Sequence, residues 1–152
     1  MKKILVLGIG NILMGDDGAG VSAINNLKKD FLENEHLKIV DGGTLGLDLL
    51  NFIEWSDILI IIDAIDIQKA PGTIIKTTIN SDLDLKVSKT SHEIDLEDLL
   101  FSAKLLDILP EKIIFFGIQV KKIIMEYGLS REVENGLNEL CEHIKRELFI
   151  YL

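Results

Sequence analysis

Residues 3–20 read KILVLGIGNILMGDDGAG, and this stretch decides the fold of the chain. Its first part, Lys3 to Ile9, is apolar at nearly every position, which predicts a strand buried on both faces of a parallel sheet. The glycines at positions 8, 10 and 15 then predict a loop. After that loop, apolar side chains recur at helical spacing, at Val21, Ile24, Leu27 and Phe31. The stretch therefore predicts a strand, a loop and an amphipathic helix.

The same alternation continues along the chain. Further strands are predicted at 37–40, 57–65, 73–79 and 112–120, and further helices at 45–53, at 96–106 and after Ser130, which can cap the last helix. The strand at 57–65 is the most hydrophobic and is expected at the sheet centre. Only residues 66–72 connect the strand at 57–65 to the strand at 73–79. A parallel crossover needs a dozen or more residues, so the strand at 73–79 should run antiparallel. The chain is therefore expected to form a single α/β domain over 1–152. Its twisted five-stranded sheet is mostly parallel, with one antiparallel strand and helices on both faces.

The composition excludes several classes of protein. The 152 residues include 16 Lys and Arg against 25 Asp and Glu, which gives a formal net charge of −9. Such a surface should repel nucleic acids. Three His and one Cys cannot build a disulfide framework or a Cys-rich zinc site. The densest apolar run, 58–62, is too short for a membrane span. Asn11 interrupts the apolar start of the chain, which is not typical of a signal peptide. We expect a cytoplasmic monomer that binds neither nucleic acid nor membrane.

Polar residues follow three of the predicted strands, and ligands of parallel sheets collect beyond the carboxyl ends of strands. The first strand leads to Asp16 and Asp17, the second to Asp41-Gly42-Gly43, and the third contains Asp63. A dinucleotide fingerprint fails, because Leu13 stands where the third glycine of G-x-G-x-x-G belongs. Capping of the helix needs only one of these two adjacent acids, Asp16 and Asp17. The other carboxylate is therefore available to face a ligand at the carboxyl ends of the strands.

Three side chains are candidates for a metal site. Asp63 interrupts an apolar strand, where a buried carboxylate must be hydrogen-bonded or metal-bound; backbone N–H groups alone would also satisfy it. His92 precedes the helix at 96–106, and a lone loop histidine is more often solvated than catalytic. Together, Asp17, Asp63 and His92 would suit nickel, zinc or iron with open coordination positions.

The sequence contains no conventional protease signature. Cys141 lies on the apolar stripe of the last helix and is expected to be an inert buried thiol. His143 projects from a different face of that helix, so it cannot activate the thiol. Neither G-x-S-x-G nor H-E-x-x-H occurs. If the chain hydrolyses a substrate, a metal-bound water or a metal-polarised carbonyl is the chemistry most available to it.

Several short motifs resemble the maturation endopeptidases of nickel–iron hydrogenases over nearly the whole chain. They are Gly10-Asn11-Ile12-Leu13 with Gly15-Asp16-Asp17-Gly18-Ala19-Gly20, Asp41-Gly42-Gly43-Thr44, Ile62-Asp63-Ala64, Ala70-Pro71-Gly72 and Ser91-His92. The resemblance implies a single α/β domain that removes a C-terminal extension from the hydrogenase large-subunit precursor once nickel has been inserted.

The resemblance also implies roles for individual residues. The nickel-recognition set falls on Asp17, Asp63 and His92, which would act as catalytic and metal-binding residues, and the precursor itself would supply the nickel. The first acid of the family is often Glu, so Asp16 is an alternative to Asp17. Asn11, Asp16, Gly42 and Gly43 are the expected substrate-binding residues. Two other functions remain open: a metallohydrolase with its own metal and a small substrate, and a non-catalytic nickel chaperone.

Overall fold

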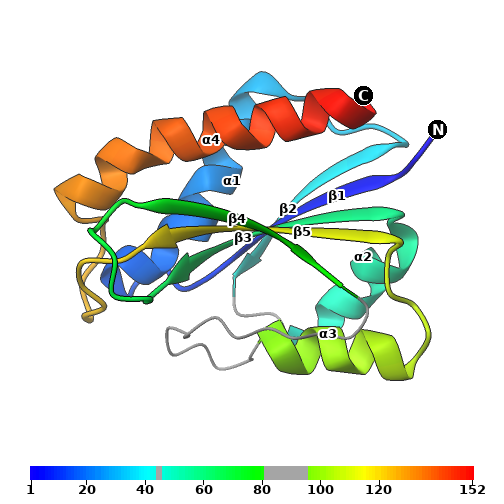
Figure 1. Ribbon diagram of the computed structural model, residues 1–152, viewed down its shortest axis with the longest axis horizontal. Coiled ribbons are helices and arrows are strands. Elements are labelled where there is room, and N and C mark those ends of the chain that lie inside the picture. Colours follow the sequence, from blue (N-terminus) through cyan, green and yellow to red (C-terminus); the bar gives the residue numbers. More distant parts are fainter. Residues whose placement is uncertain (44–45, 81–95) are drawn as a thin grey trace.

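Five strands form one sheet in the order β2-β1-β3-β5-β4 in the computed structural model, which describes residues 1–43, 46–80 and 96–152 (Figure 1). The strands are β1 (Ile4–Ile9), β2 (Leu37–Gly43), β3 (Ile58–Ile65), β4 (Ile74–Ile79) and β5 (Lys112–Gln119). All neighbouring pairs are parallel except β4 and β5, which are antiparallel. The predicted mixed sheet and its one antiparallel strand are therefore confirmed.

Helices cover both faces of the sheet, as predicted. Helices α1 (Ala19–Asp30) and α4 (Arg131–Tyr151) lie on one face, and α2 (Leu50–Trp55) and α3 (Leu96–Leu105) on the other (Figure 1). Two short 3-10 helices, η1 (Gly15–Gly18) and η2 (Gly46–Leu49), precede α1 and α2. Within the described ranges, no helix combines the length and the apolar character needed to cross a membrane.

Strand β3 lies at the centre of the sheet, as its composition predicts. All eight of its residues are buried, because β1 and β5 flank it and helices cover both of its faces. Asp63 is the one ionisable side chain within this strand. The central strand of the sheet thus contains one buried carboxylate.

Strand β2 is longer than predicted. The glycines of Asp41-Gly42-Gly43 were expected to end it at Val40, yet all three residues remain in the sheet. Asp41 pairs with Gly8 and Gly43 pairs with Ile9, so a register shift between Gly8 and Ile9 accommodates the extra residue. Pairing with a buried neighbour overrides the weak strand propensity of glycine here, a tertiary effect that a local pattern does not report.

Two glycines allow α1 to approach the sheet closely. A Cβ at Gly20 would lie 2.4 Å from the carbonyl oxygen of Ile9 and 2.5 Å from that of Ile62. A Cβ at Gly8 would lie 2.4 Å from the carbonyl oxygen of Gly20. The start of α1 therefore rests directly on the backbones of β1 and β3, which fixes the position of η1 at the carboxyl ends of these strands.

Replacing Gly20 by Ala should destabilise the fold strongly. The methyl group would overlap two backbone carbonyls that cannot move without shifting a strand, so we expect a loss of about 3 kcal/mol in the free energy of unfolding. Urea unfolding followed by circular dichroism measures this loss. Asn25→Ala, on the exposed face of the same helix, is the control and should change stability by less than about 0.5 kcal/mol. Equal effects of the two substitutions would contradict the close-packing explanation.

Candidate functional site

Asp17 and Asp63 both lie at the carboxyl edge of the central strands. Asp17 belongs to η1, is 0 % exposed, and its Oδ2 accepts a hydrogen bond of 2.9 Å from the backbone N–H of Asn11. Asp63 is 6 % exposed and lies near the carboxyl end of β3, with which η1 is in contact. The fold thus brings two buried carboxylates to one edge of the sheet from positions far apart in the sequence.

His92, the third predicted ligand, lies outside the described residues, as do Thr44 and Leu45. Only two members of the predicted metal-binding set can therefore be placed in the fold. Among residues 1–43, 46–80 and 96–152, no group of three His, Cys, Asp or Glu side chains has the arrangement of a metal site. The metal-binding roles of Asp17, Asp63 and His92 remain predictions.

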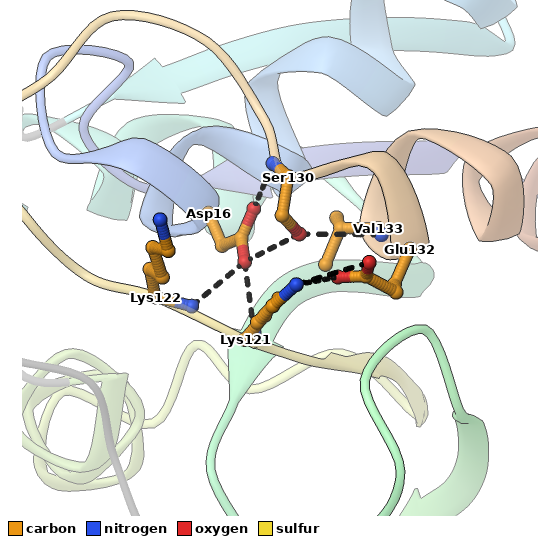
Figure 2. A network of polar contacts seen from close by, with 6 residues as sticks. All are labelled: Asp16, Lys121, Lys122, Ser130, Glu132 and Val133. Atoms are coloured by element: carbon orange, nitrogen blue, oxygen red, sulfur yellow. Dashed lines mark hydrogen bonds and ion pairs between the residues drawn. The ribbon is translucent and has the colours of Figure 1, made fainter.

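Asp16 has other partners than Asp17 and joins η1 to the segment between β5 and α4 (Figure 2). Its Oδ2 accepts hydrogen bonds from the backbone N–H groups of Lys121 (2.8 Å) and Lys122 (3.0 Å) and from the hydroxyl of Ser130 (2.8 Å). Its Oδ1 accepts a fourth, of 2.6 Å, from the backbone N–H of Ser130. This carboxylate is 1 % exposed, so four donors replace the water that burial removed.

The arrangement gives Asp16 a structural role that the sequence did not predict. A substrate contact by Asp16, or its use as a ligand in place of Asp17, would require some of these four bonds to break. The capping interpretation is also not what the structure shows, because the N-cap of α1 is Gly18, without a side-chain hydrogen bond. By contrast, Ser130 does cap α4, as predicted: its Oγ accepts a hydrogen bond from the N–H of Val133.

The predicted substrate-binding residues have different surroundings. A Cβ at Gly42 would lie 2.9 Å from Cδ1 of Leu7, so packing against β1 already explains this glycine. Gly43 has a φ of +45° and accepts a hydrogen bond of 3.2 Å from the N–H of Gly10. The Oδ1 of Asn11 accepts one from the N–H of Leu13 (2.9 Å), so an orienting contact to a peptide would fall to its Nδ2. Their roles in substrate binding remain predictions.

Cys141 is buried in the packed face of α4, as predicted. Burial raises the pKa of its thiol, mainly by desolvation of the thiolate. His143 lies on the outer side of the helix, where its Nε2 is 3.6 Å from Oε1 of Glu139. The Cys141 thiol is thus protonated at neutral pH and remote from the carboxyl edge, so it has none of the properties of a catalytic nucleophile.

The protection of Cys141 can be measured. Because the reactive species is the thiolate, and because the sulfur is buried, iodoacetamide should alkylate Cys141 at least about tenfold more slowly in the native protein than in urea-unfolded protein at the same pH. Mass spectrometry of samples quenched over time gives both rates. Equal rates would contradict the buried, protonated state.

Removing the carboxylate of Asp16 should cost several hydrogen bonds at once. Asp16→Ala leaves three backbone N–H groups and one hydroxyl without their acceptor, so we expect a loss of about 3 kcal/mol in the free energy of unfolding. Asp16→Asn keeps the shape of the side chain but turns one acceptor into a donor, and it should also be destabilising. Urea unfolding provides the measurement, with the exposed Asp48→Asn as the matched control. A stability within about 0.5 kcal/mol of the wild type in both Asp16 variants would refute the structural role.

Comparison with known proteins supports a single family. The model of the hydrogenase maturation protease family matches residues 21–147. The hydrogenase 2 maturation protease of Escherichia coli (strain K12) is 33 % identical over 144 residues, which cover 93 % of this chain and 88 % of that protein. The hydrogenase expression/formation protein HupD of Rhodobacter capsulatus is 34 % identical over 132 residues, but this chain spans only 62 % of its length.

The fold agrees with the same family. The solved structure of the hydrogenase maturating endopeptidase HybD from E. coli superposes with a TM-score of 0.85 at 31 % sequence identity, and covers 96 % of this chain and 91 % of that one. The sheet order, the antiparallel β4 and the two buried acids described above therefore occur in a chain that resembles an endopeptidase along almost its entire length. This chain belongs to the hydrogenase maturation protease family.

Proposed function

We propose that this chain is an endopeptidase that removes the C-terminal extension of a nickel–iron hydrogenase large-subunit precursor after nickel insertion. The observation that carries the proposal is the pair of buried carboxylates, Asp17 and Asp63, at the carboxyl edge of the sheet in a chain of the hydrogenase maturation protease family. Nickel held by the precursor is part of the substrate in this proposal. Asp17, Asp63 and His92 would recognise it.

The burial of the two acids supports metal recognition. Buried carboxylates are costly for a protein unless hydrogen bonds or a cation compensate their charge. Here the backbone N–H of Asn11 donates to one oxygen of Asp17, which orients the carboxylate through a rigid main-chain contact. A preoriented carboxylate binds an arriving cation with little loss of conformational entropy.

Each residue would have a distinct task during cleavage. Asp17, Asp63 and His92 would dock the nickel of the precursor and so fix the scissile bond relative to the sheet edge. Gly43, whose left-handed backbone carries no side chain, would let the substrate main chain approach, with Gly42 beneath it packed on β1. Asn11 would orient the peptide through Nδ2. The metal would make the peptide carbonyl more open to attack by water, or would activate the attacking water itself, so that water is the nucleophile in either case.

Substitution of the three proposed ligands tests this assignment. Asp17→Asn and Asp63→Asn keep the side-chain volume, and His92→Ala removes the imidazole, so each should lower the rate of cleavage of nickel-loaded precursor by at least about 100-fold. Circular dichroism checks that each variant is folded, and His143→Ala and Asp48→Asn are the matched controls. Wild-type rates in all three ligand variants would disprove the proposed recognition of nickel.

The nickel requirement is tested with two forms of the same precursor. Nickel-loaded precursor should lose its C-terminal extension, seen as a defined drop in mass, while nickel-free precursor should stay intact. Binding of the loaded precursor without any loss of mass would instead identify a nickel chaperone. A stoichiometric metal ion that stays with the purified chain, together with cleavage of both precursors, would favour an enzyme with its own metal.

A further inference from the structure

Five large apolar side chains are exposed on two loops at the carboxyl edge of the sheet. We call this set the loop patch; it consists of Ile12, Leu13, Ile124, Met125 and Tyr127. Met125 and Tyr127 are 88 % and 77 % exposed. A single exposed apolar residue is ordinary, but a contiguous group marks a surface that binds a partner.

Backbone contacts and shared cavities bring Ile12, Ile124 and Tyr127 of the patch together. The N–H of Gly15 donates to the carbonyl oxygen of Glu126 (2.8 Å), and that of Asp16 donates to the carbonyl oxygen of Lys122 (3.0 Å). Ile12 and Tyr127 line the same surface cavity of about 250 Å³. Ile124 and Tyr127 line a second cavity of about 420 Å³, so the tyrosine stands between two hollows. Tyrosine is among the residue types that contribute most to the binding energy of protein interfaces, and the cavities on either side of Tyr127 could receive side chains of a partner.

The Asp16 carboxylate holds this surface in place. The segment 121–130 contains no helix or strand, yet the four hydrogen bonds to Asp16 fix both of its ends (Figure 2). Exposed apolar side chains on a fixed loop lose little freedom when a partner binds, which favours tight docking. The buried carboxylate of Asp16 thus fixes the loop that carries Ile124, Met125 and Tyr127, although these side chains are not part of the hydrophobic core.

Six charged side chains line the larger hollow: the cations of Lys121, Lys122 and Arg131, and the carboxylates of Asp16, Glu126 and Glu132. The Nζ of Lys121 lies 3.1 Å from a carboxylate oxygen of Glu132. Lys122 and Arg131 line the same hollow, and within the part of the chain that the structure describes neither side chain forms an ion pair. Asp16 and Glu132 have partners within this chain, so Lys122 and Arg131 outnumber the one remaining carboxylate of the hollow, that of Glu126. A partner with apolar side chains next to a carboxylate would complement this surface.

The position of the patch identifies the partner. Asn11, whose N–H binds Asp17, directly precedes Ile12 and Leu13 in the same loop. A protein that brings a metal to Asp17 would therefore come close to these two side chains. We propose that the loop patch is the docking surface for the large-subunit precursor, with Tyr127 as its central anchor and with Lys122 and Arg131 facing an acidic group of the precursor. This inference rests on the proposed function and extends it to a surface outside the metal-recognition residues.

The decisive experiment separates docking from cleavage. Tyr127→Ser and Met125→Ser are measured for the KM and kcat of cleavage of nickel-loaded precursor, and for the Kd of the precursor by isothermal titration calorimetry. Leu32→Ser is the matched control, because Leu32 is 87 % exposed but follows α1 at the opposite edge of the sheet. Tyr127→Ser should raise KM and Kd at least about tenfold and change kcat by less than about twofold, whereas Leu32→Ser should change none of them.

Charge reversal tests the electrostatic part. The double variant Lys122→Glu/Arg131→Glu should raise KM at least about tenfold at low salt, and the difference from the wild type should shrink at high salt. The double variant Lys28→Glu/Lys29→Glu, on the exposed end of α1, makes the same change of charge elsewhere and should leave KM within about twofold.

The possible outcomes distinguish the two proposals. If the wild type cleaves the precursor and the patch variants keep its KM and Kd, the docking surface is wrong and the proposed function stands. If the wild type binds the precursor without cleaving it and Tyr127→Ser abolishes that binding, the docking surface stands and the proposed function fails. A wild type that neither binds nor cleaves overturns both. Conversion of a wild-type dimer to monomers by Tyr127→Ser, with KM unchanged, would assign the patch to a second copy of this chain.

Discussion

The burial of one carboxylate, that of Asp16, constrains the whole carboxyl edge of the sheet. A carboxylate that is removed from water needs hydrogen-bond donors from the protein. Here the donors are the backbone N–H groups of Lys121 and Lys122 and both the backbone N–H and the hydroxyl of Ser130. Since Ser130 also caps α4, a single side chain connects the loop after β1, the loop after β5 and the start of the last helix. The neighbouring Asp17 is held on the same 3-10 helix, so its position depends on this connection.

The fold could be predicted from the sequence because its main signals are local. The dense apolar run at 58–62 within the predicted strand 57–65 indicated a strand covered on both sides, and β3 is indeed the central strand. The short connection at 66–72 excluded a parallel crossover, and β4 is antiparallel. The extension of β2 through Gly42 and Gly43 could not be predicted in the same way. It results from pairing with β1 across a shift in register, which depends on a strand that is remote in the sequence.

The site was predictable in part for the same reason. Asp17 and Asp63 stand out locally, one at a helix start and the other within an apolar strand, and both lie at the expected edge of the sheet. The two adjacent acids nevertheless have different hydrogen-bond partners, and no local pattern distinguishes them. The carboxylate of Asp16 meets its partners 105 to 114 positions further along the chain. Contacts of that kind follow from the tertiary structure alone, and so does the assembly of the loop patch from two distant loops.

That separation along the chain has a consequence for how the protein is made. Contacts between residues that are far apart in sequence form late, because a long loop must be closed before they contribute to stability. During synthesis, Asp16 leaves the ribosome long before Lys121 and Ser130 exist, so the carboxyl edge cannot reach its final form until Ser130 has emerged. The strands and α1 can collapse earlier on apolar contacts alone. A chain of the hydrogenase maturation protease family thus completes this edge of its sheet only after the segment that leads into α4 has been synthesised.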